Sequence, residues 1–344
     1  MRRDAKKVTM RQIAAGARVS VGTVSHVINN TAGVREAVRR RVQKAIDRLG
    51  YQPSLLARGL RRNQTTIIGV IIPDISNPFF PQVVRGIEDV AYQKSYRLML
   101  CNTDNDAAKE RVYFDELRAY RMAGLIVIPS ADSQLAKIEQ GSRSTGTPVI
   151  CVDRRAPNWQ GDTITVDNVH GAYEATRVLI DAGHSLLATI TGPLHVLNAR
   201  ERLKGFKIAL REAGLTPKAT YIMEGEFDRQ SGYQKALLLL QSPRPPTAIF
   251  AANDLIALGV LSALRLLELR CPQDLSLVGF DDLEIAAFTN PALTTVAQPG
   301  YDMGAQAASL LFERLNGRAR PSQHIVMKAV LANRESVGPP PQRS

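Results

Sequence analysis

The chain has 344 residues, enough for two or three domains, and its 44 Lys and Arg against 32 Asp and Glu give a net charge of +12. Residues 1–62 hold this whole excess, with 15 basic and 3 acidic side chains, while the remaining residues carry equal numbers of each sign. That asymmetry predicts a polyanion-binding head on a neutral globular body. No apolar run is long enough to span a membrane. Because Arg11, Gln12 and Arg18 interrupt the stretch where a secretory signal needs its apolar core, we expect a cytoplasmic protein.

Three short helical patterns fill residues 9–50. The spacing of Thr9 and Gln12 is that of a capping box, Ser20 is placed to cap the second pattern, and Gly50 supplies the stop of the third. Two short helices about three residues apart, with a third as support, are typical of a helix-turn-helix.

After a short basic linker over residues 51–65, strand-like and helix-like patterns alternate to the end of the chain. Buried apolar strands alternating with helices predict a parallel, doubly wound α/β sheet, and the patterns are too many for one sheet, so we expect two α/β lobes. The stretch 293–299 and a helix over 301–316 are expected to return the chain to the first lobe. The other strands are expected at residues 67–72, 97–101, 124–128, 149–152, 186–191, 221–223, 248–251 and 275–280.

Eight segments, in this order, make the chain similar to the LacI/GalR family of bacterial transcription regulators. Each segment alone would be a weak match, but eight collinear ones make coincidence implausible. They are VSVGTVSHVINN (19–30), ARGL (57–60), IGVIIPDISNPFF (68–80), VDRRAP (152–157), ARERLKGF (199–206), AANDLIALG (251–259), VGFDD (278–282) and PALTTVAQP (291–299).

The resemblance implies a helix-turn-helix headpiece over residues 1–50 and a hinge linker with a short helix over 51–65. It also implies a two-lobed effector-binding and dimerisation core over 66–336, similar to periplasmic sugar-binding proteins. Residues 337–344, which include three consecutive prolines, are expected to form a disordered tail. Because prolines cannot continue a helix and no heptad pattern precedes them, we expect a homodimer without a tetramerisation helix.

Three positions depart from the family pattern. Arg18 occupies the turn position that normally carries Gly, Arg35 replaces the Ser that usually caps the third helix, and Gly59 lies in the hinge. A left-handed Arg18 costs about 1–2 kcal/mol, the lost cap costs about 1 kcal/mol, and Gly59 weakens a helix by nearly as much. We therefore expect a headpiece that orders mainly on DNA.

The resemblance places the second helix of the headpiece in the major groove of double-stranded DNA, with Val21, Gly22 and His26 at the base edges. Val21 offers only apolar contact and Gly22 has no side chain, so His26 is the one polar reader. The alternative for Ser20 and Thr23 is that they only cap a helix. The side chains placed to bond phosphates, which set the register without reading sequence, are Thr9, Ser20, Thr23, Ser25 and Asn29.

In the linker, the resemblance places Leu60 of each subunit as a wedge in the minor groove, with Arg58 beside it on the DNA and Ala57 between the paired hinge helices. The alternative is that Leu60 packs on the core. A wedge of this kind needs two protomers and a twofold site, so DNA binding implies a dimer on a near-palindromic operator.

Polar side chains such as Asp153, Asn253 and Asp281 follow predicted strands at their carboxyl ends, where open α/β sheets bind ligands. A cleft with carboxylates, an amide, a guanidinium and aromatic rings suits a polyhydroxylated ligand. The resemblance places around the effector Phe79, Phe80, Asp153, Asn198, Arg202, Phe227, Asn253, Asp281 and Gln298.

Each of these residues has a rival role as a helix cap, a strand-end hydrogen bond or a core aromatic, and Asp254 is expected to be a helix cap. Carboxylates beside Arg202 favour a sugar or a sugar acid as the effector, whereas Phe79 and Phe80 could stack a purine base. The sequence leaves open which effector binds and whether it acts as an inducer or a corepressor.

Several observations argue against an enzyme. The chain has no P-loop, dinucleotide-binding or zinc-protease motif, and its five histidines lack the spacing of metal ligands. Cys101, Cys151 and Cys271 form neither a disulfide framework nor a metal site, so no cofactor and no metal are expected. A sugar-transport binding protein would explain the core but not the basic head. The leading interpretation is a ligand-controlled, sequence-specific DNA-binding regulator, a repressor rather than an activator.

Overall fold

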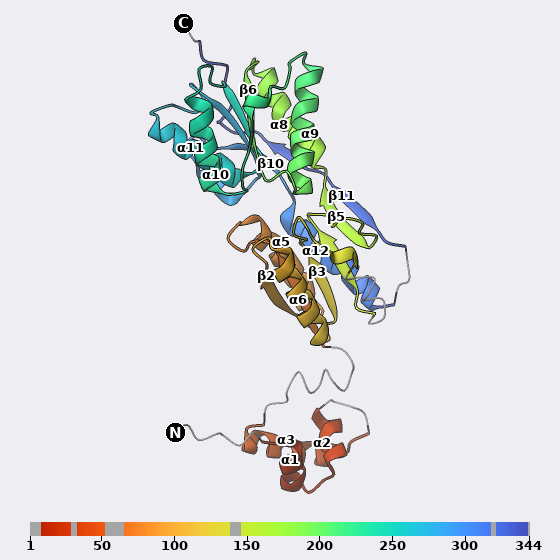
Figure 1. Cartoon of the computed structure of the whole chain (residues 1–344). Helices are drawn as coiled ribbons and strands as arrows, with labels where there is room; N and C mark the ends of the chain where they lie inside the picture. Colours follow the sequence, from red (N-terminus) through yellow and green to blue (C-terminus); the bar gives the residue numbers. More distant parts are fainter. Residues whose placement is uncertain (1–7, 29–32, 52–64, 138–145, 318–320, 343–344) are drawn as a thin grey trace. The chain divides into compact units, whose positions relative to one another are not determined.

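The structure is a computed structural model, and it describes residues 8–28, 33–51, 65–137, 146–317 and 321–342 (Figure 1). The chain divides into two compact units, Met1–Thr65 and Thr66–Ser344. Each unit has its own apolar core.

The described residues of the first unit form three helices, α1 (Met10–Ala17), α2 (Val21–Ile28) and α3 (Glu36–Leu49). The expected capping box of α1 is confirmed, since the Thr9 amide donates to the Gln12 Oε1 over 2.8 Å and the Gln12 amide donates to the Thr9 Oγ1. Ser20 Oγ accepts from the Thr23 amide at the start of α2. The three helices enclose a small core that includes Ile13, Ala14, Ala17, Val24, Val27, Val42 and Ala45.

The turn between α1 and α2 carries the strain that its sequence predicts. Arg18 has φ 53° and ψ 54°, the left-handed conformation that favours Gly. Arg35 precedes α3 without a side-chain capping bond, as expected from the missing Ser, and Gly50 ends α3. The hinge residues Ala57, Arg58 and Leu60, like Gly59, lie outside the described residues.

The second unit contains two six-stranded sheets, which confirms the two-lobed, doubly wound α/β core. The first sheet holds β1 (Ile67–Ile72), β2 (Arg97–Asn102), β3 (Gly124–Val127), β4 (Val149–Val152), β5 (Asp162–Val166) and β11 (His324–Met327). The second holds β6 (Leu187–Thr191), β7 (Ile222–Glu224), β8 (Ala248–Ala251), β9 (Ser276–Asp281), β10 (Thr294–Ala297) and β12 (Val330–Ala332). The strand orders are β11-β5-β4-β3-β1-β2 and β12-β10-β9-β8-β6-β7, and among these pairs only β10 and β12 are antiparallel.

Helices cover both faces of each sheet (Figure 1). In the first lobe, the helices that the structure describes include α5 (Phe79–Gln93), α6 (Ala107–Ala119) and α12 (Gly300–Leu315). In β1, Ile68, Val70 and Ile72 face the cluster of α5 and α12, whereas Ile71 faces the cluster of α6 on the other side. In the second lobe, α8 (Asn168–Asp181) and α9 (Leu197–Glu212) cover one face, and α10 (Arg229–Leu240) and α11 (Asp254–Leu266) cover the other.

Helices α5 and α12 pack backbone against backbone. A Cβ added to Gly86 would lie 2.0 Å from the Tyr301 carbonyl oxygen, and one added to Gly304 would lie 1.9 Å from that of Val83. Because no side chain fits at either position, the two glycines set the distance between the helices. The C-terminal helix is thereby fixed to the first helix of the core.

Within the described residues the chain passes between the lobes three times, from β5 to α8, from β10 to α12 and from β11 to β12. The expectation that the stretch 293–299 returns to the first lobe is wrong, because β10 pairs with β9 in the second sheet. The return is made by α12.

The sequence patterns also missed the strands β5, β11 and β12. In β5 the charged Asp162, which accepts two hydrogen bonds from Arg314, interrupts the apolar pattern.

The expected disordered tail over 337–344 is wrong at its start. The Gly338 amide donates to the Ser276 Oγ, and the His184 Nε2 donates to the Gly338 carbonyl oxygen over 2.9 Å. Pro340 lies in van der Waals contact range of the Cβ position of Gly183. These bonds satisfy the main-chain amide and carbonyl of Gly338 and hold the start of the tail against the second lobe. Residues 343–344 lie outside the described residues.

Candidate effector cavity and DNA-reading helix

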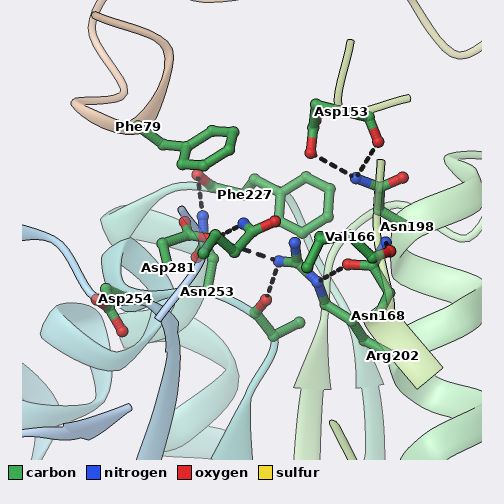
Figure 2. A network of polar contacts seen from close by, with 12 residues as sticks. Phe79, Asp153, Val166, Asn168, Asn198, Arg202, Phe227, Asn253, Asp254 and Asp281 are labelled. Carbon is green, nitrogen blue, oxygen red and sulfur yellow. Dashed lines mark hydrogen bonds and ion pairs between the residues drawn. The ribbon is translucent and has the colours of Figure 1, made fainter. Parts of the chain in front are cut away.

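A cavity of about 330 Å³ lies where the strand ends of the two lobes meet (Figure 2). Its lining brings together all nine residues expected around the effector, which are Phe79, Phe80, Asp153, Asn198, Arg202, Phe227, Asn253, Asp281 and Gln298. The sequence did not single out the other lining residues, Pro73, Asp74, Asn77, Asp104, Asn105, Arg154, Pro193, Glu226 and Asp228.

Three phenyl rings line the cavity. Phe79 and Phe80 begin α5, and their ring centroids lie 5.5 Å apart in an edge-to-face arrangement. Phe227 comes from the second lobe, where the Asn253 Nδ2 donates to its carbonyl oxygen. The Asn253 Oδ1 accepts from the Ile256 amide over 2.9 Å, so this residue both caps α11 and lines the cavity.

Arg202, on α9, has a side chain that is only 4% exposed, and several polar contacts fix its orientation. Its Nε donates to the Asn168 Oδ1 over 2.9 Å, and one terminal nitrogen donates to the Ala252 carbonyl oxygen over 2.6 Å. The same nitrogen lies 3.6 Å from the Asp281 Oδ1, and the guanidinium lies 3.7 Å above the Phe280 ring centroid. The guanidinium is therefore oriented before any effector arrives.

Two aspartates at strand ends have positive φ angles, which residues other than glycine rarely adopt. Asp281, at the end of β9, has φ 120°, and its Oδ1 accepts from the Gln298 Nε2 over 2.6 Å. Asp153, after β4, has φ 63° and accepts from the Asn198 Nδ2 over 3.1 Å, a bond that joins the lobes. Strain of this kind concentrates at ligand sites, where the surrounding structure enforces it.

Burial dominates the protonation of the carboxyl groups around the cavity. It raises the pKa of Asp281 to about 7, although Arg202 and the Gln298 amide act in the opposite direction. Burial also raises the pKa of Asp153, despite the opposing effects of Arg154 and Arg202. The rest of the lining adds Asp74, Asp104, Glu226 and Asp228 but no further cation. The cavity as a whole is acidic.

The residues expected to read DNA lie on α2 and beside it. Val21, Gly22 and His26 are exposed, with Val21 and Gly22 in the first turn of α2. Ser20 and Thr23 bond each other through their hydroxyls over 2.9 Å, next to the capping bond, so both the capping and the phosphate-binding roles stay compatible with their placement. Asn29 lies outside the described residues.

Comparison with known proteins identifies the family. The model of "Bacterial regulatory proteins, lacI family" matches residues 9–54, and that of the periplasmic binding protein-like domain matches 176–337. The ribose operon repressor of Escherichia coli K12 is 38% identical over 95% of this chain and 99% of its own. The chain belongs to the LacI family of bacterial regulatory proteins. It is a DNA-binding transcription regulator with an effector-binding core.

Other relatives point the same way. The repressor PurR of Aliivibrio salmonicida is 36% identical over 96% of this chain and 98% of its own. A solved structure of the Lac repressor dimer bound to operator and the anti-inducer ONPF is 29% identical, with a TM-score of 0.85 over 97% of this chain and all of that one. A LacI-family regulator from Enterococcus faecalis with bound ribose is 33% identical, with a TM-score of 0.71 over 79% and 99%.

Arg154 is a lining residue that strand alternation does not predict. It stands beside Asp153, and neighbours on an extended strand point to opposite faces. The positive φ of Asp153 turns the chain there, and both side chains line the cavity. Arg154 donates to the Asn105 Oδ1 over 2.7 Å, and its Nε is buried without a hydrogen-bond partner in the described part of the chain.

Asp254 is not the helix cap that was expected, because Asn253 caps α11 instead. Asn253 is extended, with φ −154°, whereas Asp254 is the first residue of the helix. The Asp254 carboxyl accepts from the Leu283 amide and the Thr295 hydroxyl. Burial and the nearby Asp281 carboxyl together raise the pKa of Asp254 to about 8.

No helix of the described chain is long and apolar enough to cross a membrane. Within the same residues, no three His, Cys, Asp or Glu side chains gather as a metal-ion site would require.

Asp254 and Asp281 make core stability depend on pH. Their pKa values, about 8 and about 7, exceed the 3.8 of an ordinary Asp, so across that range the folded state keeps protons that the unfolded state has released. The free energy of unfolding therefore falls as pH rises, by up to about 1.4 kcal/mol per unit for each retained proton. Denaturant unfolding between about pH 5 and 8 should show a smaller slope in Asp254→Asn than in the wild type. Equal slopes in the wild type and Asp254→Asn would contradict the raised pKa of Asp254.

Proposed function

We propose that the chain is a cytoplasmic, dimeric repressor that binds a near-palindromic operator, and that ribose or a closely related neutral sugar changes its operator affinity. The cavity carries this proposal. It combines three phenyl faces with an oriented guanidinium, carboxylates and amides, which together suit the faces and hydroxyls of a small sugar. The ribose operon repressor and the regulator solved with ribose are relatives over the full core.

A neutral sugar fits the charge of the cavity better than a sugar acid or a sugar phosphate. Arg202 already faces Asp281, and Arg154 lies 3.7 Å from the Asp153 carboxylate. The six acidic side chains of the lining outnumber these two cations. An anionic effector would have to displace these pairings and approach the other acidic side chains of the lining, which costs electrostatic energy.

A purine is the second candidate. Relatives named PurR are 36% identical to the chain, close to the value for the ribose operon repressor, and Phe79 and Phe80 offer faces to a flat base. The edge-to-face arrangement of these two rings, 71° between their planes, leaves no parallel slot between them. This geometry favours the sugar.

The effector proposal predicts a ribose-dependent change in operator binding that Arg202→Ala abolishes. Truncation removes a charged hydrogen-bond donor and leaves Asp281 buried without its cation, so ribose affinity should fall about 100-fold or more. Isothermal titration with ribose, ribose 5-phosphate and adenine measures the effect. Arg200→Ala is the matched control, since Arg200 lies exposed on the same helix and outside the cavity. A wild type that binds adenine or the phosphate more tightly than ribose would reject the neutral sugar.

In the headpiece, we infer that His26 reads one base position in each half-site and that Leu60 wedges the minor groove at the operator centre. His26 is the exposed polar side chain among the three residues placed at the base edges. Thr9, Ser20, Thr23, Ser25 and Asn29 are proposed to bond phosphates, and Arg58 and Ala57 to support the wedge.

These roles predict different losses for two variants. Leu60→Ala should reduce discrimination between operator and random DNA more than it reduces random binding, and His26→Ala should relax preference at one position per half-site. Site selection followed by anisotropy titrations at several salt concentrations measures both, and wild-type affinity should fall steeply with salt because counterions are released. Gln43→Ala on α3 is the control. Equal losses on operator and random DNA for both variants would reject the roles.

We propose that the second lobe carries much of the dimer interface. Its surface exposes large apolar side chains close together in sequence, with Ile285 47% and Phe288 73% exposed. Exposed apolar patches of this kind mark association surfaces. The relative that was solved with its operator, the Lac repressor, is described as a dimer.

Phe288→Asp should therefore turn the dimer into a monomer at micromolar concentration, because a charge replaces an aromatic contact. Sedimentation equilibrium measures the association state. Val112→Asp is the control, since Val112 is similarly exposed on α6 of the first lobe. A wild type that forms a stable tetramer, or a Phe288→Asp variant that stays dimeric, would contradict the proposed interface.

A further inference from the structure

Asp254 is a buried carboxyl beside the effector cavity but outside its lining. In Figure 2 its side chain lies to one side of the group formed by Asp281, Arg202 and Phe227. The carboxyl packs directly on β9, where a Cβ added to Gly279 would lie 2.1 Å from the Asp254 Oδ1. The absence of a side chain at Gly279 thus leaves room on β9 for a carboxyl that lies outside the cavity lining.

The hydrogen bonds of this carboxyl lead to a strained turn. The Asp254 Oδ2 accepts from the Leu283 amide over 2.8 Å, and its Oδ1 accepts from the Thr295 Oγ1 over 2.6 Å. Asp281 and Asp282, just before Leu283, have φ values of 120° and 54°. Two successive residues with positive φ need outside support, and the bond to Leu283 supplies it at the end of the turn.

The two ends of this turn serve different contacts. At one end, Asp281 enters the cavity and faces Arg202. At the other end, Leu283 is 1% exposed and belongs to the apolar cluster of the first lobe, with Phe79, Val83 and Met303 among its members. Leu283 follows β9 of the second sheet, so it carries an apolar contact from the second lobe into the first.

Resting on the proposed ribose response, we propose that Asp254 is a positioning residue. It holds the turn so that Asp281 meets the effector while Leu283 packs into the first lobe. The carboxyl acts as a hydrogen-bond acceptor for the Leu283 amide, and effector affinity depends on the lobe contact that this bond maintains. Binding in the cavity and packing between the lobes are then one event.

The acceptor role makes Asn the conservative replacement. Its amide oxygen can accept from the Leu283 amide, and its Nδ2 can donate to the Thr295 Oγ1, which is able to accept. Because burial raises the pKa of Asp254 to about 8, the carboxyl is mostly protonated at neutral pH, and the uncharged amide resembles it. Ala has no acceptor and leaves the buried Leu283 amide unsatisfied.

The experiment compares Asp254→Ala, Asp254→Asn and Leu283→Ala in the full chain. Ribose titration should show Asp254→Ala and Leu283→Ala each weakened about tenfold or more, and Asp254→Asn close to the wild type. In Leu283→Ala, adding Asp254→Ala should cost little more, because the contact it supports is already lost. Leu255→Ala is the matched control. Leu255 packs on the same cluster from α11 without that hydrogen bond, so its loss should add to that of Asp254→Ala.

Hydrogen exchange without effector tests the same proposal independently. Asp254→Ala should speed amide exchange both in residues 281–288 and in α5 of the first lobe, and Asp254→Asn should restore both rates. Faster exchange confined to residues 281–288, or additive losses of Asp254→Ala and Leu283→Ala, would overturn the positioning role. A wild type that does not bind ribose would reject the proposed effector, and the exchange data would still decide the role of Asp254.

Discussion

The site depends on one topological constraint, that the carboxyl edges of two parallel sheets face each other. In the described part of the chain, the three connections between the lobes follow β5, β10 and β11, and each starts from the carboxyl edge of its sheet. Two of them enter a helix, which carries the chain back before the next parallel strand. The third enters β12 directly from that edge, so β12 has to run antiparallel to β10, as observed. The cavity and the reversed strand are consequences of the same arrangement.

The facing carboxyl edges bring together polar groups that would destabilise the fold if they were buried elsewhere in the core. Arg202, Asp153 and Asp281 are all at most 4% exposed. Burial of an ionised group costs several kcal/mol of hydration free energy, which only pairing and hydrogen bonds can offset. The structure offsets this cost with the Asn168 and Ala252 oxygens around Arg202 and the Phe280 ring beneath it. A buried charge network of this kind adds little to stability, which fits a role in ligand recognition.

The family resemblance named the nine residues that line the cavity. Strand patterns alone point to Asp153, Asn253 and Asp281, because apolar strands are easy to recognise and their carboxyl ends follow directly. The patterns failed where the backbone conformation of one residue, or a partner far away in the sequence, decided the local structure. Arg154 was missed because the left-handed Asp153 breaks strand alternation, which no pattern reveals. Asn253 and Asp254 are both good capping residues, and only the extended backbone of Asn253 shows which one caps α11. β5 was missed because the buried Asp162 serves a distant arginine, Arg314.

The turn over residues 281–283 connects the effector cavity with the apolar contact between the lobes. An effector shifts an equilibrium only by the difference in its affinity for the two states, so contacts inside one lobe alone would change nothing. Asp281 lines the cavity and Leu283 packs into the first lobe, so in the proposed mechanism the same turn makes cavity occupancy sensitive to how the lobes meet. Thermodynamic linkage then requires reciprocity: whatever factor the effector imposes on operator binding, the operator imposes on effector binding. On the proposal made for Asp254, the buried bond from the Leu283 amide to the Asp254 carboxyl holds the two ends of the turn together and so sets how much of that binding energy becomes coupling.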